Sequence, residues 1–281
     1  MIQDIAPHHL YNAYKPRPPR GDSYILYFEK RTCLLRRTEI GIGFPTFAET
    51  EQLKYDFYEH CIYLFSVDDD SYYLTFNPEI CLLDGYRLEG VELFRTAEPQ
   101  CAAFAGLTGL HLDNWYKNHQ YCGKCGEKTI PDRKERMMRC PKCGNMEFPV
   151  ICPATIIAVT DGNRILLSKY AGRTYKRYAL LAGYTEIGET AEETVRREVM
   201  EEVGLKVKNI RYYKSQPWGL SGTLLMGFYC ELDGSDEIRL DKEELALAEW
   251  FEREEIPVEP MHDTLTNEMI IHFKYGSNEK L

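Results

Sequence analysis

The segment GYTEIGETAEETVRREVMEEVGL, residues 183–205, contains a helix whose two ends are both marked in the sequence. Thr190 and Glu193 form a T-x-x-E capping box, which is typical of the first turn of a helix. Gly204 is a natural terminator, because glycine readily adopts the left-handed conformation that follows a last helical turn. We therefore predict a helix from Ala191 to Val203. The apolar stripe that would dock this helix on a sheet consists of Ala191, Val195, Val199 and Val203.

Three glutamates form an acidic stripe beside the apolar one. At 100° per residue, Glu198, Glu201 and Glu202 fall within an arc of about 100°. Exposed like charges three or four residues apart repel by a few tenths of a kcal/mol per pair, so we expect something to offset the repulsion. Clustered carboxylates suit hard divalent cations, which prefer oxygen ligands. On helical geometry alone, a solvated charged face explains the stripe equally well.

The loop before the helix favours the metal site over the solvated face. Glu189 stands near the start of the helix, and Gly183 and Gly188 would allow the loop to fold back. Arg197 can pair within the acidic set and hold a carboxylate in place.

Nine residues of this segment match every specified position of the Nudix box, GX5EX7REUXEEXGU, where U is aliphatic. They are Gly183, Glu189, Arg197, Glu198, Val199, Glu201, Glu202, Gly204 and Leu205. A chance match is on the order of one in a million, so the segment resembles the Nudix hydrolase family. The resemblance implies an α+β fold with a mixed sheet in an α/β/α sandwich. It also implies two or three Mg²⁺ or Mn²⁺ ions on Glu198, Glu201 and Glu202, with one of these or a nearby glutamate as base. The expected catalytic group is Glu198, Glu201, Glu202, Glu189 and Arg197.

Two cysteine pairs precede this domain, in the spacing C-x2-C-x14-C-x2-C. A closed shell of four thiolates would hold one structural Zn²⁺ per chain and leave no position for water. The expected ligands are Cys122, Cys125, Cys140 and Cys143. Two redox dithiols are a weaker reading, because two such pairs rarely coincide at this spacing. Seven basic residues in the segment raise a third reading, a ribbon that binds DNA or RNA, although a solvated basic hairpin explains them more simply. They are Lys124, Lys128, Arg133, Lys134, Arg136, Arg139 and Lys142.

A second motif, SQPW at residues 215–218, follows the box after ten residues. The order of cysteine ribbon, FPVICPATI, Nudix box and SQPW resembles the NADH pyrophosphatase branch of the family. That branch continues SQPW with Pro-Phe-Pro, whereas this chain has Gly219-Leu220-Ser221, and Thr223 takes the last serine position. Val150 and Cys152 also replace the arginine and serine usual before the strand. These departures leave the choice among dinucleotides open.

The resemblance assigns further residues by local alignment. Tyr184 matches an aromatic that stacks on a substrate base, and Glu244 matches a late glutamate that completes the metal site. The expected substrate-binding residues are Tyr184, Gln216, Trp218, Thr223 and Thr266. The simpler alternatives are a packed loop tryptophan for Trp218 and a charge on a helix surface for Glu244.

The residue composition and the pattern of apolar residues change along the chain and predict three domains. These are a β-rich domain at 1–115, the zinc ribbon at 116–148 and the Nudix domain at 149–281. In the first, SYILYF (23–28), CIYLFSV (61–67) and SYYLTF (71–76) predict antiparallel strands. No helical periodicity stands out there, although residues 46–61 are compatible with a helix. In the third, we predict two strands around an Asp161-Gly162-Asn163 turn and another at 223–232.

Composition narrows the class of protein. The net charge of −10 does not favour non-specific binding to nucleic acid or to anionic membranes. No run of 18 apolar residues is present, so no segment is expected to span a membrane. The start of the chain lacks the plan of a signal peptide. The six cysteines outside the ribbon mostly have apolar neighbours, which predicts reduced, buried thiols and a cytoplasmic location.

The resemblance to the NADH pyrophosphatase branch implies an enzyme that hydrolyses NAD(H) to NMN(H) and AMP. Removal of NAD caps from RNA 5′ ends by the same site is the first alternative, and hydrolysis of ADP-ribose or another dinucleotide is the second. A different class of protein, a metal-independent regulator that binds NAD or nucleic acid, fits less well because the glutamate set is intact. The resemblance also implies a homodimer. The preferred dinucleotide, the metal used and the role of the N-terminal domain stay open.

Overall fold

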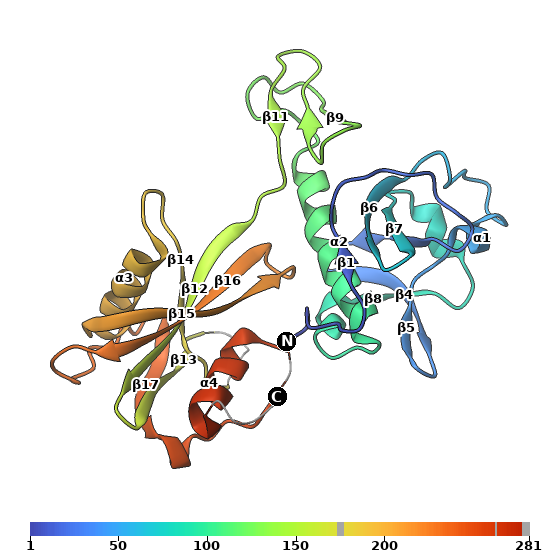
Figure 1. Cartoon of the computed structure of the whole chain (residues 1–281). Helices are drawn as coiled ribbons and strands as arrows, with labels where there is room; N and C mark the ends of the chain where they lie inside the picture. The colour runs from blue at the N-terminus through green and yellow to red at the C-terminus, as the bar shows by residue number, and fades with distance from the viewer. Residues whose placement is uncertain (173–176, 262, 277–281) are drawn as a thin grey trace. The chain divides into compact units, whose positions relative to one another are not determined.

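The computed structural model describes residues 1–172, 177–261 and 263–276, which form two compact units (Figure 1). The N-terminal unit comprises Ile2–Val150 together with Gly219–Gly222. The C-terminal unit comprises Met1, Ile151–Trp218 and Thr223–Leu281. Each unit is described separately below.

The C-terminal unit is built on a mixed six-stranded sheet. Its strands are β12 (Cys152–Asp161), β13 (Arg164–Tyr170), β14 (Leu181–Tyr184), β15 (Val207–Trp218), β16 (Thr223–Leu232) and β17 (Leu245–Glu252). The strand order is β15-β16-β12-β13-β17, and β14 pairs with β12. Strands β12 and β16 are parallel and the other pairs are antiparallel, which confirms the mixed sheet. The two-residue turn at Gly162-Asn163 and the strand at 223–232 are also as predicted.

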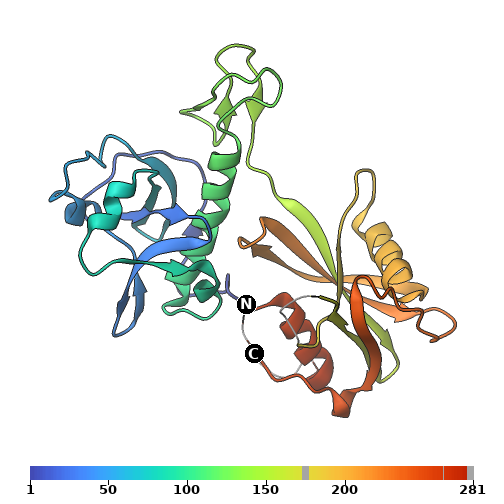
Figure 2. The ribbon, with the colours of Figure 1, turned by 180° about the vertical axis from the view of Figure 1, so that it is seen from behind.

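Two helices cover opposite faces of this sheet, as Figures 1 and 2 show. They are α3 (Ala191–Val203) and α4 (Leu265–Tyr275), and the short helix η3 (Arg253–Glu255) follows β17. Side chains alternate across strand β12, as the twofold period of a strand requires. Ile157 and Val159 pack in the core beneath α3, while Ile156 and Ala158 pack in the core beneath α4. This alternation gives the α/β/α sandwich that the resemblance implied.

Helix α3 begins and ends at the predicted residues, Ala191 and Val203. The capping box is complete: the Thr190 hydroxyl accepts the Glu193 N–H at 3.2 Å, and the Glu193 carboxylate accepts the Thr190 N–H at 2.7 Å. Gly204 has a φ of +69°, the left-handed conformation that ends the helix. The three valines of the predicted stripe are fully buried against the sheet, and its fourth member, Ala191, is partly buried beside them.

The N-terminal unit is rich in strands, as predicted. One sheet contains β1 (Leu10–Tyr11), β6 (Ile62–Val67), β7 (Asp70–Leu74) and β2 (Tyr24–Leu26); the other contains β3 (Phe28–Glu29), β4 (Thr32–Thr38), β5 (Gly41–Gly43) and β8 (Arg87–Gly90). The antiparallel pairing of β6 with β7 is confirmed. The prediction was wrong for β2, which lies parallel to β7. The long segment between β2 and β7 supplies the crossover that a parallel pair needs.

Helices complete this unit. The segment at 46–61 contains only the short helix α1 (Phe47–Thr50), and η1 (Pro78–Leu82) and η2 (Val91–Arg95) follow it. The long helix α2 (Gln100–Asn118) was not predicted. Twelve of its 19 residues are buried, so it shows no polar face from which a helical period could be read. A Cβ at Gly106 would come within 2.4 Å of the Phe94 ring, which shows how closely α2 is packed.

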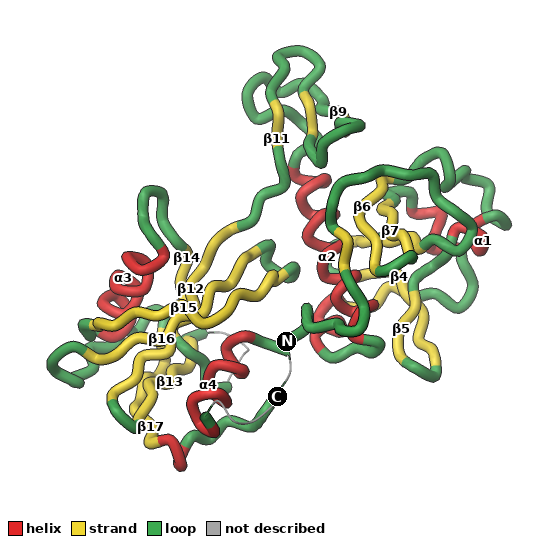
Figure 3. The backbone as a smooth tube through the Cα atoms, viewed as in Figure 1, coloured by secondary structure: helices red, strands yellow, loops and turns green. Residues whose placement is uncertain are grey.

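The cysteine segment extends from this unit as three very short strands, β9 (Ile130–Pro131), β10 (Met138–Arg139) and β11 (Met146–Glu147) (Figure 3). It is tied to the rest of the unit by Met138, which joins the main core, and by Arg136, whose guanidinium donates to the Leu64 carbonyl at 2.6 Å. The predicted domain boundary at 115/116 falls inside α2. None of the helices in the described ranges has the length and apolar character to cross a membrane.

Truncation of the α3 stripe should destabilise the C-terminal unit. We expect Val199→Ala to lower its free energy of unfolding by about 2 kcal/mol, because buried methyl groups are lost and a cavity remains. Met200→Ala is the matched control on the exposed side of the same helix and should cost less than about 0.5 kcal/mol. Urea unfolding followed by circular dichroism measures both, and equal effects would contradict the docking of this face.

Candidate active site

Arg197 lies at the centre of the acidic set on α3. Its Nε donates to Glu189 Oε1 at 2.6 Å, and its Nη1 donates to Glu198 Oε1 at 2.7 Å and Glu201 Oε2 at 2.9 Å. Its Nη2 donates to Glu189 Oε2 and to the Tyr184 carbonyl, both at 2.9 Å. One guanidinium therefore joins the loop before the helix, two glutamates of the helix and the end of β14.

Glu189 is held as a permanent anion. The hydrogen bond from Arg197 is the main cause that lowers the pKa of Glu189 to about 2. Its Oε2 also accepts from the Thr194 hydroxyl at 3.0 Å and from the Glu186 N–H at 3.1 Å. These bonds fold the loop back onto the helix, as predicted from its glycines, and make Glu189 a poor proton acceptor.

Glu198 is almost covered, with 8% of its surface exposed. Burial raises its pKa, Arg197 opposes the shift, and the negative charges of Glu201 and Glu244 add to it. A Cβ at residue 183 would lie only 1.9–2.2 Å from the Glu198 carboxylate, so only glycine fits there. The first glycine of the box thus makes room for a carboxylate between helix and sheet.

Glu244 acts on this carboxylate from 46 residues further along the chain. It lies in the turn before β17 rather than on a helix, so the helix-surface alternative was wrong. Glu202 is also buried, at 2% exposure, whereas most of the Glu201 side chain is exposed. The cysteines are the only group of three or more candidate ligands, among the residues that the structure describes, whose ligand atoms all lie within 4.8 Å. The glutamates share one region without closing into such a shell.

The donor set nevertheless fits a hard divalent cation. The carboxylates of Glu198 and Glu201 both converge on one positively charged nitrogen of Arg197. The negative charge of Glu244, a third carboxylate, also raises the pKa of Glu198. Crowded carboxylates of this kind stabilise an added positive charge, and oxygen ligands are those that Mg²⁺ and Mn²⁺ prefer.

Two of the predicted substrate residues meet beside this set. Tyr184, at the end of β14, exposes 54% of its surface, and its hydroxyl lies 3.4 Å from the Thr223 hydroxyl. Thr223 begins β16 and is itself buried. Trp218, at the end of β15, is Thr223's partner in the antiparallel ladder. The structure therefore gathers residues of the box and of the later motif at one end of the sheet, with the Tyr184 ring open to solvent.

Gln216 is fully buried and engaged inside the protein. Its Nε2 donates to the Asp263 carbonyl at 2.9 Å, and its Oε1 accepts from the Leu265 N–H at 2.8 Å. The amide thus holds the first turn of α4, where Thr266 lies. Thr266 lines a cavity of about 540 Å³ with Lys169 and Tyr178, neither of which was predicted. They belong to no motif, so no sequence signal marks them.

The glycine at residue 219, in place of the first proline of Pro-Phe-Pro, has a steric reason within the N-terminal unit, to which Gly219–Gly222 belong. A Cβ at Gly219 would lie 2.2 Å from the Leu107 carbonyl oxygen of α2. A proline there carries that Cβ and would collide with the helix backbone. Gly222 has a φ of +69°, which favours glycine, and a Cβ there would come within 3.1 Å of His111 Nε2.

The four ribbon cysteines form the predicted cluster. The Sγ atoms of Cys122 and Cys143 lie 3.6 Å apart, and those of Cys125 and Cys140 lie 3.4 Å apart. All four are free thiols. The backbone N–H of Cys143 points at Cys140 Sγ and lowers the pKa of that thiol to about 7. A tetrahedral shell of thiolates is what a structural zinc requires, and the residues present fit it.

A glycine follows each cysteine pair and adopts a left-handed conformation. Gly126 and Gly144 have φ values of +73° and +72°. Their N–H groups donate to the carbonyls of Cys122 and Cys140, at 2.9 and 3.1 Å. Each pair therefore closes a tight turn around its sulfurs.

Comparison with known families agrees with both regions. Residues 151–273 match the NUDIX domain, and residues 117–148 match the NADH pyrophosphatase zinc ribbon domain. The family model and the cysteine cluster together support a structural zinc in the ribbon.

Curated relatives are similar to this chain over 58% of its length. The chain is 42% identical over 170 residues to the NAD-capped RNA hydrolase NudC of Mannheimia succiniciproducens, covering 58% of this chain and 63% of the relative. It is 40% identical over 162 residues to the protein of that name from Escherichia coli O1:K1 / APEC, with coverage of 58% and 63%. The chain thus spans less than two thirds of the length of these relatives. A NUDIX hydrolase structure from Nitrosomonas europaea has a TM-score of 0.48 and 23% identity, covering 55% of this chain and 90% of that one.

Loss of one ribbon cysteine should release the zinc without disturbing α3. We expect Cys140→Ser to lower the zinc content from one atom per chain to nearly none and to expose the amides of residues 122–143 to hydrogen exchange. Cys152→Ser, an exposed thiol outside the cluster, is the matched control and should keep its zinc. Metal analysis with hydrogen-exchange mass spectrometry checks this. Full zinc content in Cys140→Ser would contradict the four-thiolate site.

Proposed function

Because residues 151–273 match the NUDIX domain, we propose that the chain is a Nudix hydrolase that cleaves the pyrophosphate bond of NAD(H), adding water to give NMN(H) and AMP. The observation that carries this proposal is the hub at Arg197, which ties Glu189, Glu198 and Glu201 together beside the exposed ring of Tyr184. The match to an NADH pyrophosphatase zinc ribbon supports NAD(H) as the dinucleotide.

Mg²⁺ or Mn²⁺ would be held by Glu198, Glu201, Glu202 and Glu244. When bound, such ions neutralise the diphosphate and lower the pKa of a coordinated water. The protein prepares this region by keeping Glu198 in a space that only a glycine at residue 183 leaves open. The number of ions and the choice between the two metals are part of the proposal.

Arg197 and Glu189 position the set rather than accept the proton of the attacking water. Glu189, with a pKa of about 2, stays ionised and keeps the guanidinium in place. The guanidinium in turn orients Glu198 and Glu201. Burial and the neighbouring negative charges raise the pKa of Glu198. A group with a raised pKa is the better proton acceptor, so the base is sought among the helix glutamates.

Tyr184 would orient the substrate by stacking on one of its bases. Its ring is exposed, while the contact with Thr223 fixes the hydroxyl end. Trp218 lies next to Thr223 and offers a second ring. Thr266 and its cavity at the start of α4 are the remaining part of the proposed substrate site.

NAD-capped RNA is the second candidate substrate, since relatives about 40% identical are named NAD-capped RNA hydrolases. The same bond would be cleaved, with the RNA body leaving the site through an open path. The two substrates, together with NAD⁺ and ADP-ribose, are ranked by measuring kcat/KM for each with Mg²⁺ or Mn²⁺ and identifying the products by chromatography. A homodimer and a cytoplasmic location remain predictions, which light scattering and cell fractionation test.

A metal-independent regulator would behave differently in the same assay. It would bind NAD without releasing AMP, and added divalent metal would change nothing. AMP release that requires Mg²⁺ or Mn²⁺ therefore separates the enzyme from the regulator.

Glu198→Gln should lower kcat by at least about 100-fold, because a neutral amide neither binds the cation strongly nor accepts a proton. The protein should stay folded, since glutamine has nearly the same shape. Glu192→Gln is the control on the exposed first turn of the same helix and should leave kcat unchanged. Turnover of NADH with Mn²⁺ measures both, and a near-wild-type rate for Glu198→Gln would exclude the assignment.

Tyr184→Ala should raise KM for NADH roughly 5- to 150-fold, since stacking of a base on an aromatic ring contributes about 1–3 kcal/mol. Tyr184→Phe keeps the ring and loses only the contact with Thr223, so its KM should stay close to that of the wild type. Steady-state kinetics distinguish the two variants. Equal KM values in both would show that the ring does not contact the substrate.

A further inference from the structure

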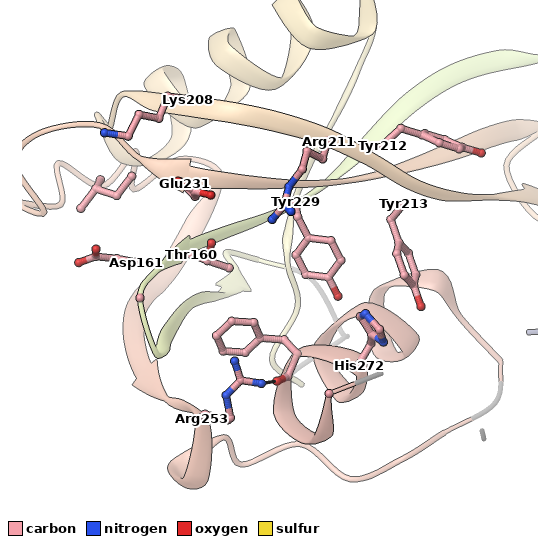
Figure 4. Close-up of a pocket in the computed structure, with 14 residues that line it drawn as sticks. Thr160, Asp161, Lys208, Arg211, Tyr212, Tyr213, Tyr229, Glu231, Arg253 and His272 are labelled. Carbon is pink, nitrogen blue, oxygen red and sulfur yellow. Dashed lines mark hydrogen bonds between the residues drawn. The ribbon is translucent and has the colours of Figure 1, made fainter. Parts of the chain in front are cut away.

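The C-terminal unit has a second cavity, of about 800 Å³, to which none of the proposed catalytic or substrate residues contributes (Figure 4). It lies between the sheet and the C-terminal end of α4. Six of its lining residues matter below: Arg211, Tyr213, Tyr229, Arg253, His272 and Phe273. Along β16, the first residue that lines this cavity is Tyr229. Tyr229 is six residues from Thr223 of the candidate active site, which at about 3.3 Å per residue is a distance of roughly 20 Å. The cavity is therefore separate from the candidate active site.

The cavity carries positive charge that the protein does not use. The Arg211 guanidinium makes no hydrogen bond or ion pair with any residue in the described part of the chain. Arg253 is fixed, with Nε bonded to Asn163 Oδ1 at 3.0 Å and Nη1 donating to the Phe273 carbonyl, but no carboxylate within the described ranges pairs with it. In a chain of net charge −10, two such arginines in one cavity are a local attraction for an anion.

The other charged groups of the lining are largely neutralised. Asp161 pairs at 2.7 Å with Arg164, which it shares with Asp236 at 2.7 Å, and Lys208 pairs with Asp233 at 3.1 Å. Glu231 accepts a hydrogen bond from the Asn209 amide at 2.7 Å and keeps its charge. Arg211 and Arg253 together with Glu231 give a net charge of about +1. This charge suits a single phosphate better than a polyphosphate.

Aromatic rings form the other wall. The Tyr229 hydroxyl donates to the Met269 carbonyl at 2.6 Å, and the Tyr213 hydroxyl donates to Glu268 at 3.1 Å. Because both hydroxyls are engaged, these residues present ring surface to the cavity. The His272 ring lies 5.0 Å from that of Tyr213 and 6.0 Å from that of Tyr229. In Figure 4 the rings of Tyr213 and Tyr229 extend from the sheet toward His272 on α4, and Arg211 lies on the sheet side of the cavity.

We propose that this cavity is a second nucleotide site, which binds a nucleoside 5′-monophosphate group with its phosphate on Arg211 and Arg253 and its base against Tyr213, Tyr229 and His272. Guanidinium groups bind phosphate oxygens in a geometry that ammonium groups do not match. Rings stack on any base, and the volume is within the roughly 300–1,000 Å³ of small-molecule sites. The group is either a free mononucleotide or one nucleotide of an RNA chain. The proposal does not depend on the activity proposed above.

The test measures the binding of AMP and of its bromo analogue, and it does not depend on catalytic turnover. Crystals of the full chain are soaked with 8-bromo-AMP, and the bromine is located by its anomalous signal; bromine in the cavity supports the proposal, and none there at saturation overturns it. In solution, AMP binding is titrated without added divalent metal. Arg211→Glu should weaken binding at this site about tenfold or more, because a charge-assisted hydrogen bond contributes about 1.5–3 kcal/mol.

Two controls sharpen the result. Arg87→Glu makes the same charge change at an exposed position on β8 and should alter AMP affinity less than twofold. A short 5′-phosphorylated RNA that displaces AMP identifies an RNA nucleotide as the occupant, whereas displacement only by mononucleotides identifies a free nucleotide.

Equal AMP binding by wild type and Arg211→Glu would overturn the site. Inorganic phosphate that binds as tightly as AMP would overturn the role of the rings. NADH turnover of Arg211→Glu should match the wild type, so failure here is distinct from failure of the proposed activity.

Discussion

The ion-pair hub of Arg197 is the interaction on which the candidate active site depends. A single guanidinium satisfies Glu189, Glu198 and Glu201, and it also binds the backbone carbonyl of Tyr184. Removal of one member of such a partly buried set leaves charges without their partner, which costs more than the pair itself contributes. The hub therefore explains how two glutamates of the helix and one of the preceding loop can lie so close together, and it fixes the loop against the helix.

The hub works only because the sheet and the helix approach closely. The valine stripe of α3 packs on the sheet, and Gly183 leaves the space that the Glu198 carboxylate fills. Burial removes water from the Glu198 carboxylate and thereby raises its pKa. A bound cation would stabilise the negative charge that burial destabilises. The close packing of Gly183 against Glu198 therefore also sets the electrostatic environment of the Glu198 carboxylate. The proposed chemistry depends on both.

The two ends of the C-terminal sheet differ in charge. The candidate active site is acidic and fits cations, whereas the cavity at the other end of β15 and β16 holds arginines without carboxylate partners in the described structure. One sheet can present both because its strands are long enough to separate them. In the N-terminal unit, helix α2 leaves no room for a side chain at Gly219, which accounts for the absence of proline at that position after SQPW.

The sequence by itself determined the features that depend on neighbouring residues. The ends of α3 follow from a capping box and a terminal glycine within a few residues, and the zinc cysteines follow from two short pairs. Only the tertiary structure decided what depends on contacts between distant segments. Helix α2 is buried almost all round and so shows no period, β2 pairs in parallel across a long crossover, and Glu244 acts on Glu198 from 46 residues away. Hydrogen bonds between neighbouring residues can be predicted from a short stretch of sequence. Packing and electrostatic contacts involve residues far apart in the sequence, so no short sequence pattern predicts them.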